Sequence, residues 1–154
     1  MQKIEIFDST LRDGAQGGNI SFSVEDKFKI MKALDDMGVD FIEAGNPSSN
    51  QKDMDFFHKA FNYELKHARL VAFGSTRRKN IDVHEDRNVR SLADAGTEYV
   101  SLFGKSWDMH VTEIIQTTLE ENLAMIYDTI KYFSDMGKKV FFKLAFSLLS
   151  SWFL

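Results

Sequence analysis

The sequence contains no cysteine, a single proline and no long apolar segment. Without cysteine there is no disulfide framework, no thiolate nucleophile and no cysteine-ligated zinc, so oxygen or imidazole ligands must bind any metal ion. The first residues lack the apolar stretch of a signal peptide. The longest apolar run, residues 144–154, is interrupted by serine and is too short to cross a bilayer. We therefore expect a cytoplasmic protein.

Basic residues are fewer than acidic residues. The chain has 19 Lys and Arg against 23 Asp and Glu residues, a formal net charge of -4, spread along its length. No basic stripe is available to follow a phosphate backbone, so we expect neither nucleic acid nor a membrane as a partner. P-loop, GxGxxG and HExxH patterns are absent as well, which leaves nucleotide hydrolysis, dinucleotide redox chemistry and zinc peptidase activity without support.

What the chain does have is one repeated pattern: a β-rich run, a polar loop, an amphipathic stretch and a glycine. The spacing of the runs, roughly 30 residues or more, is that of successive βαβ units. With 154 residues and 44% hydrophobic composition, the chain fits one domain or part of one. Strands are predicted at residues 4–7, 40–43, 70–73, 99–103 and 139–142.

Two of the intervening segments carry clear helix signals. Ser23 with Asp26, and Thr118 with Glu121, are predicted capping boxes at helix starts. Apolar residues at helical spacing predict one buried face for each helix: Phe28, Met31, Leu34 and Met37 in the first, and Leu123, Ile126, Ile130 and Phe133 in the second. Three helices are expected to end in a glycine, which adopts the left-handed conformation at low cost: Gly38, Gly96 and Gly137.

Alternating strands and helices predict a parallel sheet, either open and doubly wound or closed into a barrel. Polar loops follow several of the predicted strands, which favours the barrel, because a barrel takes its catalytic residues from many strands. A full barrel needs about 250 residues and eight units. This chain supplies four units and the start of a fifth. We therefore predict an α/β fold, the amino-terminal half of a (β/α)8 TIM barrel with parallel strands alternating with helices.

The densest polar cluster follows the first predicted strand. There two aspartates, Asp8 and Asp13, flank Arg12, and nearby glycines allow the backbone to approach a ligand closely. Asp13 can ligate a hard divalent cation, and Arg12 can bind a carboxylate or an enolate oxygen. The alternative is a surface ion pair without function. The position at the carboxyl end of a strand favours the functional interpretation.

Three further features are candidates with ordinary alternatives. Glu43 lies in or just past a buried strand, so its carboxylate should face the barrel mouth, where bracing the arginine is favoured over catalysis. The basic residues 77–79 can receive a phosphate-bearing substrate or cofactor, although we favour a solvated loop. His110 contacts substrate or metal, or else caps or packs. The other histidines are expected at the surface: His58, His67 and His84.

Three motifs together resemble a known family: DSTLRDGAQ at residues 8–16, FIEAG at 41–45 and FGSTRRK at 73–79. They are similar to those of the citramalate synthase, isopropylmalate synthase and homocitrate synthase family of metal-dependent TIM barrels, to which hydroxymethylglutaryl-CoA lyase is related. Residues 74–79, 103–108 and 110–113 resemble the citramalate synthase branch in particular. The resemblance extends from Ile4 to about Phe142.

The resemblance implies an acyltransferase that condenses acetyl-CoA with a 2-oxo acid in isoleucine and leucine biosynthesis. The favoured reaction converts pyruvate to citramalate. It implies a divalent metal ion, Mg, Mn or Zn, with acetyl-CoA as co-substrate, and we expect the full-length protein to be a homodimer. Isopropylmalate synthase, homocitrate synthase and a related carbon–carbon lyase stay open as alternatives. A non-enzymatic alternative is a half-barrel module that associates with itself.

The same resemblance implies roles for five residues. Arg12 is the catalytic residue and stabilises the enolate and the developing alkoxide, while Asp13 is the metal ligand supplied by the first strand. Gln16 helps to shape the substrate pocket. Glu43 holds the arginine, and His110 lies at the substrate mouth.

The sequence also departs from the family. Family members carry a His-x-His pair on a later strand. After the residues that match 140–142 they continue with an acidic strand-five segment whose glutamate takes part in catalysis, whereas this chain continues with KLAFSLLSSWFL from residue 143. We therefore expect residues 1–142 to be the amino-terminal part of the catalytic barrel. Residues 143–154 are expected to be an aberrant or truncated tail, produced by a frameshift or an assembly break, and the chain alone is expected to be inactive.

Overall fold

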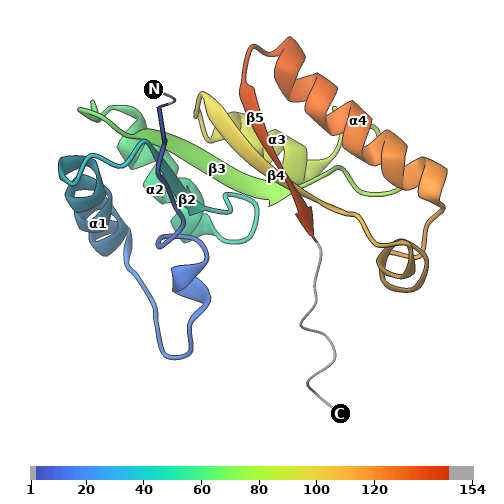
Figure 1. Cartoon of the computed structure of the whole chain (residues 1–154), viewed down its shortest axis with the longest axis horizontal. Coiled ribbons are helices and arrows are strands. Elements are labelled where there is room, and N and C mark those ends of the chain that lie inside the picture. The colour runs from blue at the N-terminus through green and yellow to red at the C-terminus, as the bar shows by residue number, and fades with distance from the viewer. Residues whose placement is uncertain (1–2, 146–154) are drawn as a thin grey trace.

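The computed structural model describes residues 3–145, in which strands and helices alternate (Figure 1). The strands are β1 (Phe7–Asp8), β2 (Phe41–Gly45), β3 (Arg69–Ser75), β4 (Tyr99–Lys105) and β5 (Lys139–Ala145). The α-helices are α1 (Val24–Asp36), α2 (Gln51–Phe61), α3 (Arg87–Asp94) and α4 (Leu119–Asp135). A 3-10 helix, η1 (Gly14–Gln16), follows β1, and a π-helical turn, η2 (His110–Ile114), follows β4. The strands form one parallel sheet in the order β1-β2-β3-β4-β5.

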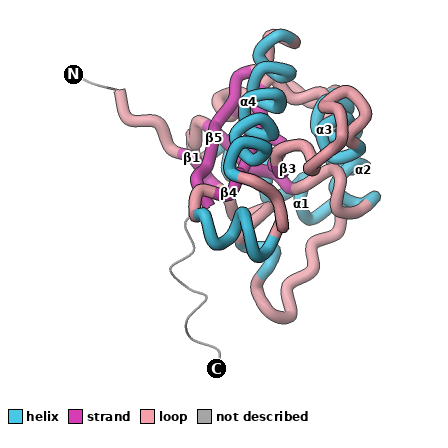
Figure 2. The backbone as a smooth tube through the Cα atoms, turned by 90° about the vertical axis from the view of Figure 1, so that its right-hand side faces the viewer, coloured by secondary structure: helices cyan, strands magenta, loops and turns pink. Residues whose placement is uncertain are grey.

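The sheet is rolled, as the beginning of a barrel must be. In a flat sheet β1 and β5 would lie about 19 Å apart, because neighbouring strands are about 4.8 Å apart. Instead, the ring of Phe7 on β1 lies 5.2 Å from the ring of Phe141 on β5. The helices lie to one side of the strands (Figure 2). The predicted fold, parallel strands alternating with helices in a half-barrel, is confirmed.

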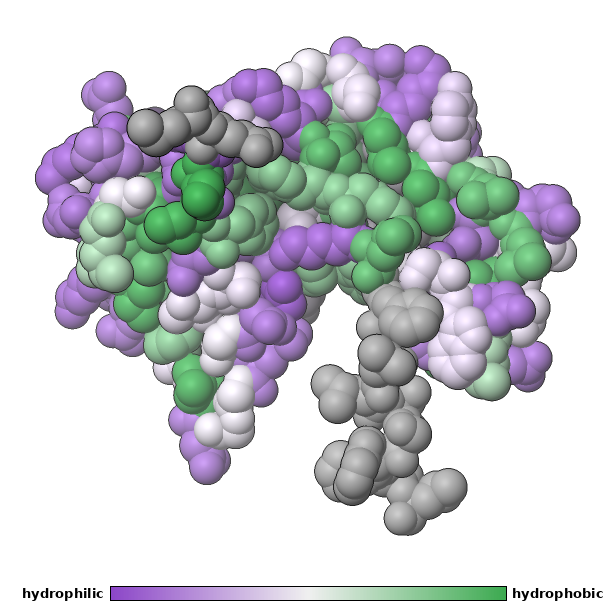
Figure 3. Space-filling view, in the orientation of Figure 1, coloured by the Kyte–Doolittle hydropathy of each residue, from purple (hydrophilic) through white to green (hydrophobic). Residues whose placement is uncertain are grey.

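Side chains on the two faces of the sheet form two apolar layers. The outer layer packs between the strands and the helices and includes Met31, Phe56, Leu92 and Phe133. The inner layer is aromatic, with Phe41, Val71 and Tyr99 buried at its centre and Phe7 and Phe141 packed against them. Hydrophobic residues gather over the strands on this face in Figure 3. Successive residues of a strand therefore serve opposite layers, as the pleat requires.

The ends of the sheet differ from the predicted strands. β1 begins at Phe7 rather than Ile4, because β2 offers it partners only at Phe41 and Ile42, and the side chain of Ile4 is 86% exposed. At the other end, β5 runs to Ala145 and so passes the predicted boundary after residue 142. Residues 146–154, on which most of the predicted aberrant tail falls, lie outside the described residues.

Helix boundaries follow the capping signals, with one difference. The box of Ser23 and Asp26 at the start of α1 is complete, with both reciprocal hydrogen bonds present. At α4 only half of the predicted box exists: Thr118 accepts from the N–H of Glu121, but the Glu121 carboxylate accepts from Arg77 instead. The three predicted glycine ends are confirmed, with φ of 82° at residue 38, 71° at residue 96 and 76° at residue 137.

The predicted buried faces of two helices are partly wrong. Met37 is 78% exposed, because it is the C-cap residue of α1 and lies beyond the last helical turn against the core. Leu123 is 65% exposed, because α4 turns a different face to the sheet. That face is part polar and consists of Asn122, Met125, Thr129 and Phe133. Among residues 3–145, no helix is both long enough and apolar enough to span a membrane.

Candidate active site

The loop after β1 is a tight turn that separates two neighbouring side chains. The carbonyl oxygen of Ser9 accepts hydrogen bonds from the N–H groups of Arg12, Asp13 and Gly14. The side chain of Arg12 is only 16% exposed, whereas that of Asp13 is 61% exposed. Arg12 Nη1 still contacts Asp13 Oδ1 at 2.8 Å. The predicted pair therefore lies at the carboxyl end of β1, with the guanidinium recessed and the carboxylate facing solvent.

Glu43 links the first two strands to the last. Its side chain is fully buried, and its Oε2 lies 2.7 Å from both Nε and Nη2 of Arg12. Its Oε1 accepts a 2.8 Å hydrogen bond from Nζ of Lys143 on β5. A buried carboxylate without a cation would be strongly unfavourable, so the two cations stabilise Glu43 while Glu43 fixes them.

Aromatic rings complete the surroundings of the two cations. The guanidinium carbon of Arg12 lies 4.2 Å from the ring centroid of Phe73, which stacks on Phe103 with the centroids 5.4 Å apart. Lys143 Nζ lies 4.5 Å from the centroid of Phe7. Cations are attracted to ring faces, and the attraction is stronger where water is excluded. Both cations are thus held by a carboxylate and by an aromatic face.

Asp13 is the one sequence-predicted metal ligand. Its exposed carboxylate suits a hard cation, but within residues 3–145 no group of three or more His, Asp or Glu side chains could hold a metal ion. The described residues therefore contribute one candidate ligand and do not by themselves form a metal site.

A recess of about 260 Å³ lies beside Arg12. Gln16, at the end of η1, and Asn46, after β2, both line it. The structure therefore brings Gln16 and Arg12 to one cavity at the carboxyl ends of β1 and β2. Gln16 itself is an exposed residue.

A buried ion pair that lines this recess is not among the residues predicted from the sequence. Lys27 of α1, 3% exposed, donates to Asp53 of α2 and, at 2.9 Å, to the carbonyl oxygen of Ala44. Asp53 in turn accepts from the N–H of Asn46 at 3.0 Å. Gly45 has a φ of 142°, and a Cβ there would lie 2.7 Å from Asp53 and 2.8 Å from Lys27. The pair fixes the loop after β2. Its signal was the position of Lys27, one helical turn before the buried Met31.

His110 is buried but stands apart from this cluster. It is 5% exposed, and its ring lies 4.7 Å from that of Trp107. Its Nδ1 is buried without a hydrogen-bond partner among the described residues, and no hydrogen bond joins it to Arg12, Asp13 or Glu43. The residue begins the turn η2, and π-helical turns often occur at functional sites.

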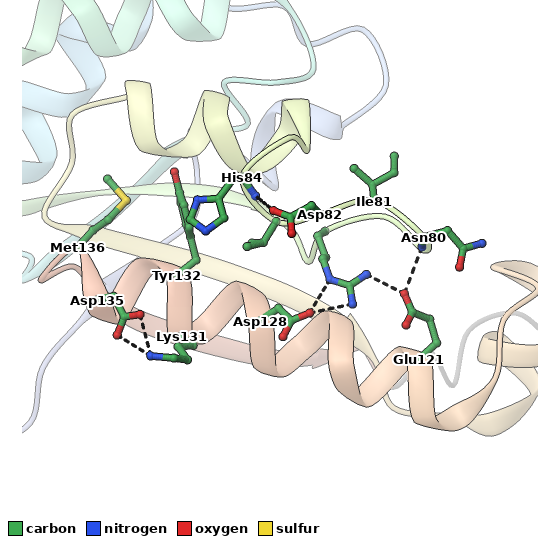
Figure 4. A pocket seen from close by; sticks show the side chains of 12 residues that line it. Asn80, Ile81, Asp82, His84, Glu121, Asp128, Lys131, Tyr132, Asp135 and Met136 are labelled. Carbon is green, nitrogen blue, oxygen red and sulfur yellow. Dashed lines mark hydrogen bonds and ion pairs between the residues drawn. The ribbon is translucent and has the colours of Figure 1, made fainter.

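The basic residues after β3 do not form the solvated loop that we favoured. Arg77 is 7% exposed and pairs with Glu121 and Asp128 of α4, each contact being shorter than 3 Å. Burial would lower the pKa of Arg77, but the hydrogen bonds to these two carboxylates outweigh it and raise the pKa. In Figure 4, Glu121 and Asp128 point from α4 towards the loop after β3, where a cavity of about 630 Å³ lies. Arg78 and Lys79 stay nearer to solvent, paired with Asp86 and with the carbonyl oxygen of Gln116.

A rolled parallel sheet with charged groups at the carboxyl ends of its strands defines the class: part of a βα-barrel whose candidate site has the position of a barrel active site. The chain matches the HMGL-like family over residues 3–151 and belongs to that family.

Its relatives include two (R)-citramalate synthases. The protein from Aquifex aeolicus is 52% identical over 141 residues, which cover 92% of this chain and 27% of that protein. The protein from Sulfolobus acidocaldarius is 48% identical, covering 90% of this chain and 27% of its own length. A 2-isopropylmalate synthase from Saccharolobus solfataricus is 33% identical, and the aligned residues cover 92% of this chain and 34% of that protein. The chain thus spans about a quarter to a third of the length of these relatives.

Among solved structures, the HMG-CoA lyase from Bacillus subtilis superposes with a TM-score of 0.70 at 18% identity, covering 92% of this chain and 46% of that one. An HMG-CoA lyase from Pseudomonas aeruginosa superposes with a TM-score of 0.67 at 16% identity, covering 90% of this chain and 44% of that one. At such identities the likeness shows the shared barrel fold alone.

Proposed function

We propose that this chain is part of the catalytic barrel of an acyltransferase that condenses acetyl-CoA with pyruvate to give citramalate. The observation that carries the proposal is the recessed guanidinium of Arg12, held by Glu43 at the carboxyl end of β1 in a chain 52% identical to a citramalate synthase. In this reaction the methyl group of acetyl-CoA loses a proton, its carbon adds to the ketone, and water cleaves the thioester to release CoA.

Arg12 is proposed as the catalytic residue. Negative charge appears first on the enolate oxygen and then on the alkoxide, and a guanidinium fixed in advance stabilises both without reorganisation. Glu43 supports this role because its buried carboxylate fixes the orientation of Arg12 at two nitrogen atoms. Glu43 is therefore proposed as a positioning residue at the edge of the substrate site.

Three further assignments are proposed on the family resemblance. Gln16 would shape the pocket, which fits its place in the recess beside Arg12. His110 would contact substrate, and its unpaired Nδ1 is available for a ligand. Asp13 would contribute one oxygen ligand to a divalent metal ion, which as a Lewis acid would polarise the oxo acid. The homodimer and the cytoplasmic location stay predictions.

The choice of citramalate over isopropylmalate follows from the relatives. The citramalate synthases are 42–52% identical to this chain, and the isopropylmalate synthases are 30–33% identical. The lyase alternative is supported by the HMGL-like family match and by the fold that the chain shares with HMG-CoA lyases at 16–18% identity. Pyruvate is therefore the 2-oxo acid that we propose.

A chimera tests the proposal. The 141 aligned residues of this chain replace those of the Aquifex aeolicus citramalate synthase, and release of free thiol from acetyl-CoA is followed with pyruvate, a branched 2-oxo acid and a 2-oxo dicarboxylate. Thiol release that requires pyruvate supports the proposal. Preference for the branched acid would point to isopropylmalate synthesis, and a folded chimera without thiol release would reject the acyltransferase proposal.

The 154-residue chain is assayed alone beside the chimera. We expect no turnover from it, because within residues 3–145 no group of three or more His, Asp or Glu side chains could hold a metal ion. The chain has no cysteine, so it adds no thiol signal of its own to the assay.

A further inference from the structure

Lys143 is a charged residue near Arg12 to which the proposed reaction assigns no role. It lies near the carboxyl end of β5, three strands away from β2 in the sheet order, yet its Nζ reaches Glu43 Oε1 at 2.8 Å. The rolling of the sheet brings it there, because alternate residues of β5 face the barrel interior, Phe141 among them. Lys143 and Arg12 therefore flank one carboxylate from opposite sides of the half-barrel.

Lys143 and Arg12 each have N–H groups that make no hydrogen bond within residues 3–145. An ammonium group has three N–H donors and a guanidinium has five. Within residues 3–145, Lys143 donates one hydrogen bond, to Glu43, and Arg12 contacts Glu43 through Nε and Nη2 and Asp13 through Nη1. At least two N–H groups remain on each side chain for a ligand.

The cluster of Arg12, Lys143 and Glu43 carries more positive than negative charge. Two cations share the single buried carboxylate of Glu43. The second nearby carboxylate, that of Asp13, is 61% exposed, so solvent screens much of its charge. The side chains of Arg12 and Lys143 are 16% and 38% exposed, which leaves them accessible to a small ligand. An accessible, partly desolvated site with an excess of positive charge attracts an anion.

We propose that Lys143 and Arg12 form a binding site for the carboxylate group of a small organic acid, with Glu43 setting the distance between the two cations. The identity of this acid as the 2-oxo acid substrate rests on the proposed function. The anion site itself rests only on the geometry of the three side chains. Lys143 is in that case a substrate-binding residue supplied by the fifth strand.

Oxalate serves as the probe, because it carries carboxylate groups and cannot react. Its binding to the 154-residue chain is measured by calorimetry at low ionic strength, for the wild type and for Lys143→Met, Lys143→Arg and Lys139→Met. Lys139 is the matched control: it lies on the same strand and pairs with Glu98 at the opposite end of β5. Urea unfolding of each variant shows whether it folds, and Lys143→Gln replaces Lys143→Met if the latter does not.

Lys143→Met removes a charged hydrogen bond to oxalate, so its affinity for oxalate should fall about ten- to a hundredfold. Lys143→Arg should keep most of the affinity, and Lys139→Met should change it less than about twofold, because its charge is remote and screened. A purely structural role would lower the urea midpoint of Lys143→Met and leave oxalate affinity unchanged in the folded protein, which would overturn the proposal. Failure of the wild type to bind oxalate would also overturn it.

The two proposals fail separately. If Lys143→Met binds oxalate as well as the wild type while the chimera releases thiol from acetyl-CoA, the anion site is wrong and the function stands. If oxalate binding depends on Lys143 while the chimera releases no thiol, the anion site stands and the 2-oxo acid is not its ligand.

Discussion

Replacing Lys27 with methionine should destabilise the fold more than any surface substitution in this chain. Lys27 is 3% exposed, and its side chain is the cation that contacts the largely buried carboxylate of Asp53. Methionine fills similar space, but among the described residues it leaves that carboxylate with only the N–H of Asn46, and it removes the lysine donor from the carbonyl oxygen of Ala44. Removing one partner of a buried ion pair typically costs about 3–5 kcal/mol.

Urea unfolding followed by circular dichroism measures this loss, and two further variants define its origin. In Lys27→Met with Asp53→Asn the charge is gone and an acceptor for Asn46 remains, so the double variant should recover about half of the loss or more. Lys59→Met breaks a similarly short but exposed pair with Glu25 and should change stability little. If Lys27→Met were no less stable than Lys59→Met, the buried pair would not be what fixes the loop after β2.

Three other predictions concern the same fold. Asp35 is buried, and although burial raises the pKa of its carboxyl, three backbone N–H groups outweigh this and lower the pKa from its ordinary value of 3.8. Its stabilisation is thus present above that value and lost as the pH falls through the lower folded value, so Asp35→Asn should flatten the acid limb of a plot of unfolding free energy against pH. Arg77→Met should lower the unfolding free energy by about 1–3 kcal/mol by removing two carboxylate contacts, whereas Lys131→Met should change it little; equal urea midpoints would contradict this. Gly45→Ala should lower it by more than about 1 kcal/mol, because the positive φ and the contact with Asp53 are both incompatible with a Cβ; an unchanged melting temperature would count against that strain.

The order of strands and helices could be predicted because it depends on local signals. β-rich runs, capping residues and glycine ends recur at regular spacing, and each reflects a backbone preference of a few residues. The faces of the helices were less predictable. Asn122 and Thr129 lie buried on α4 because the first donates to the carbonyl oxygen of Lys105 and the second accepts from the N–H of Arg77. A hydrophobic pattern cannot find a buried face whose polar groups are satisfied by distant residues.

The candidate site likewise contains contacts that the sequence predicts and contacts that it does not. The contact between Arg12 and Glu43 was predictable, because both follow or end neighbouring parallel strands. Lys143 lies where the sequence departs from the family motifs, and its partner Glu43 is 100 residues away, so no local pattern predicts a contact that exists only in a rolled sheet. Arg77 was expected in a solvated loop for a related reason, because its partners lie on α4. Sequence patterns do not predict these two sets of ion pairs, because the partners lie far along the chain and on elements that are not neighbours in sequence.

The most direct test of the account is the rate of thiol release from acetyl-CoA and pyruvate by the chimera with Arg12→Met. If a recessed guanidinium stabilises the developing oxyanion, kcat should fall on the order of a hundred- to a thousandfold in a protein that still folds. A variant that turns over at the rate of the unsubstituted chimera would contradict the claim that this arginine carries the chemistry.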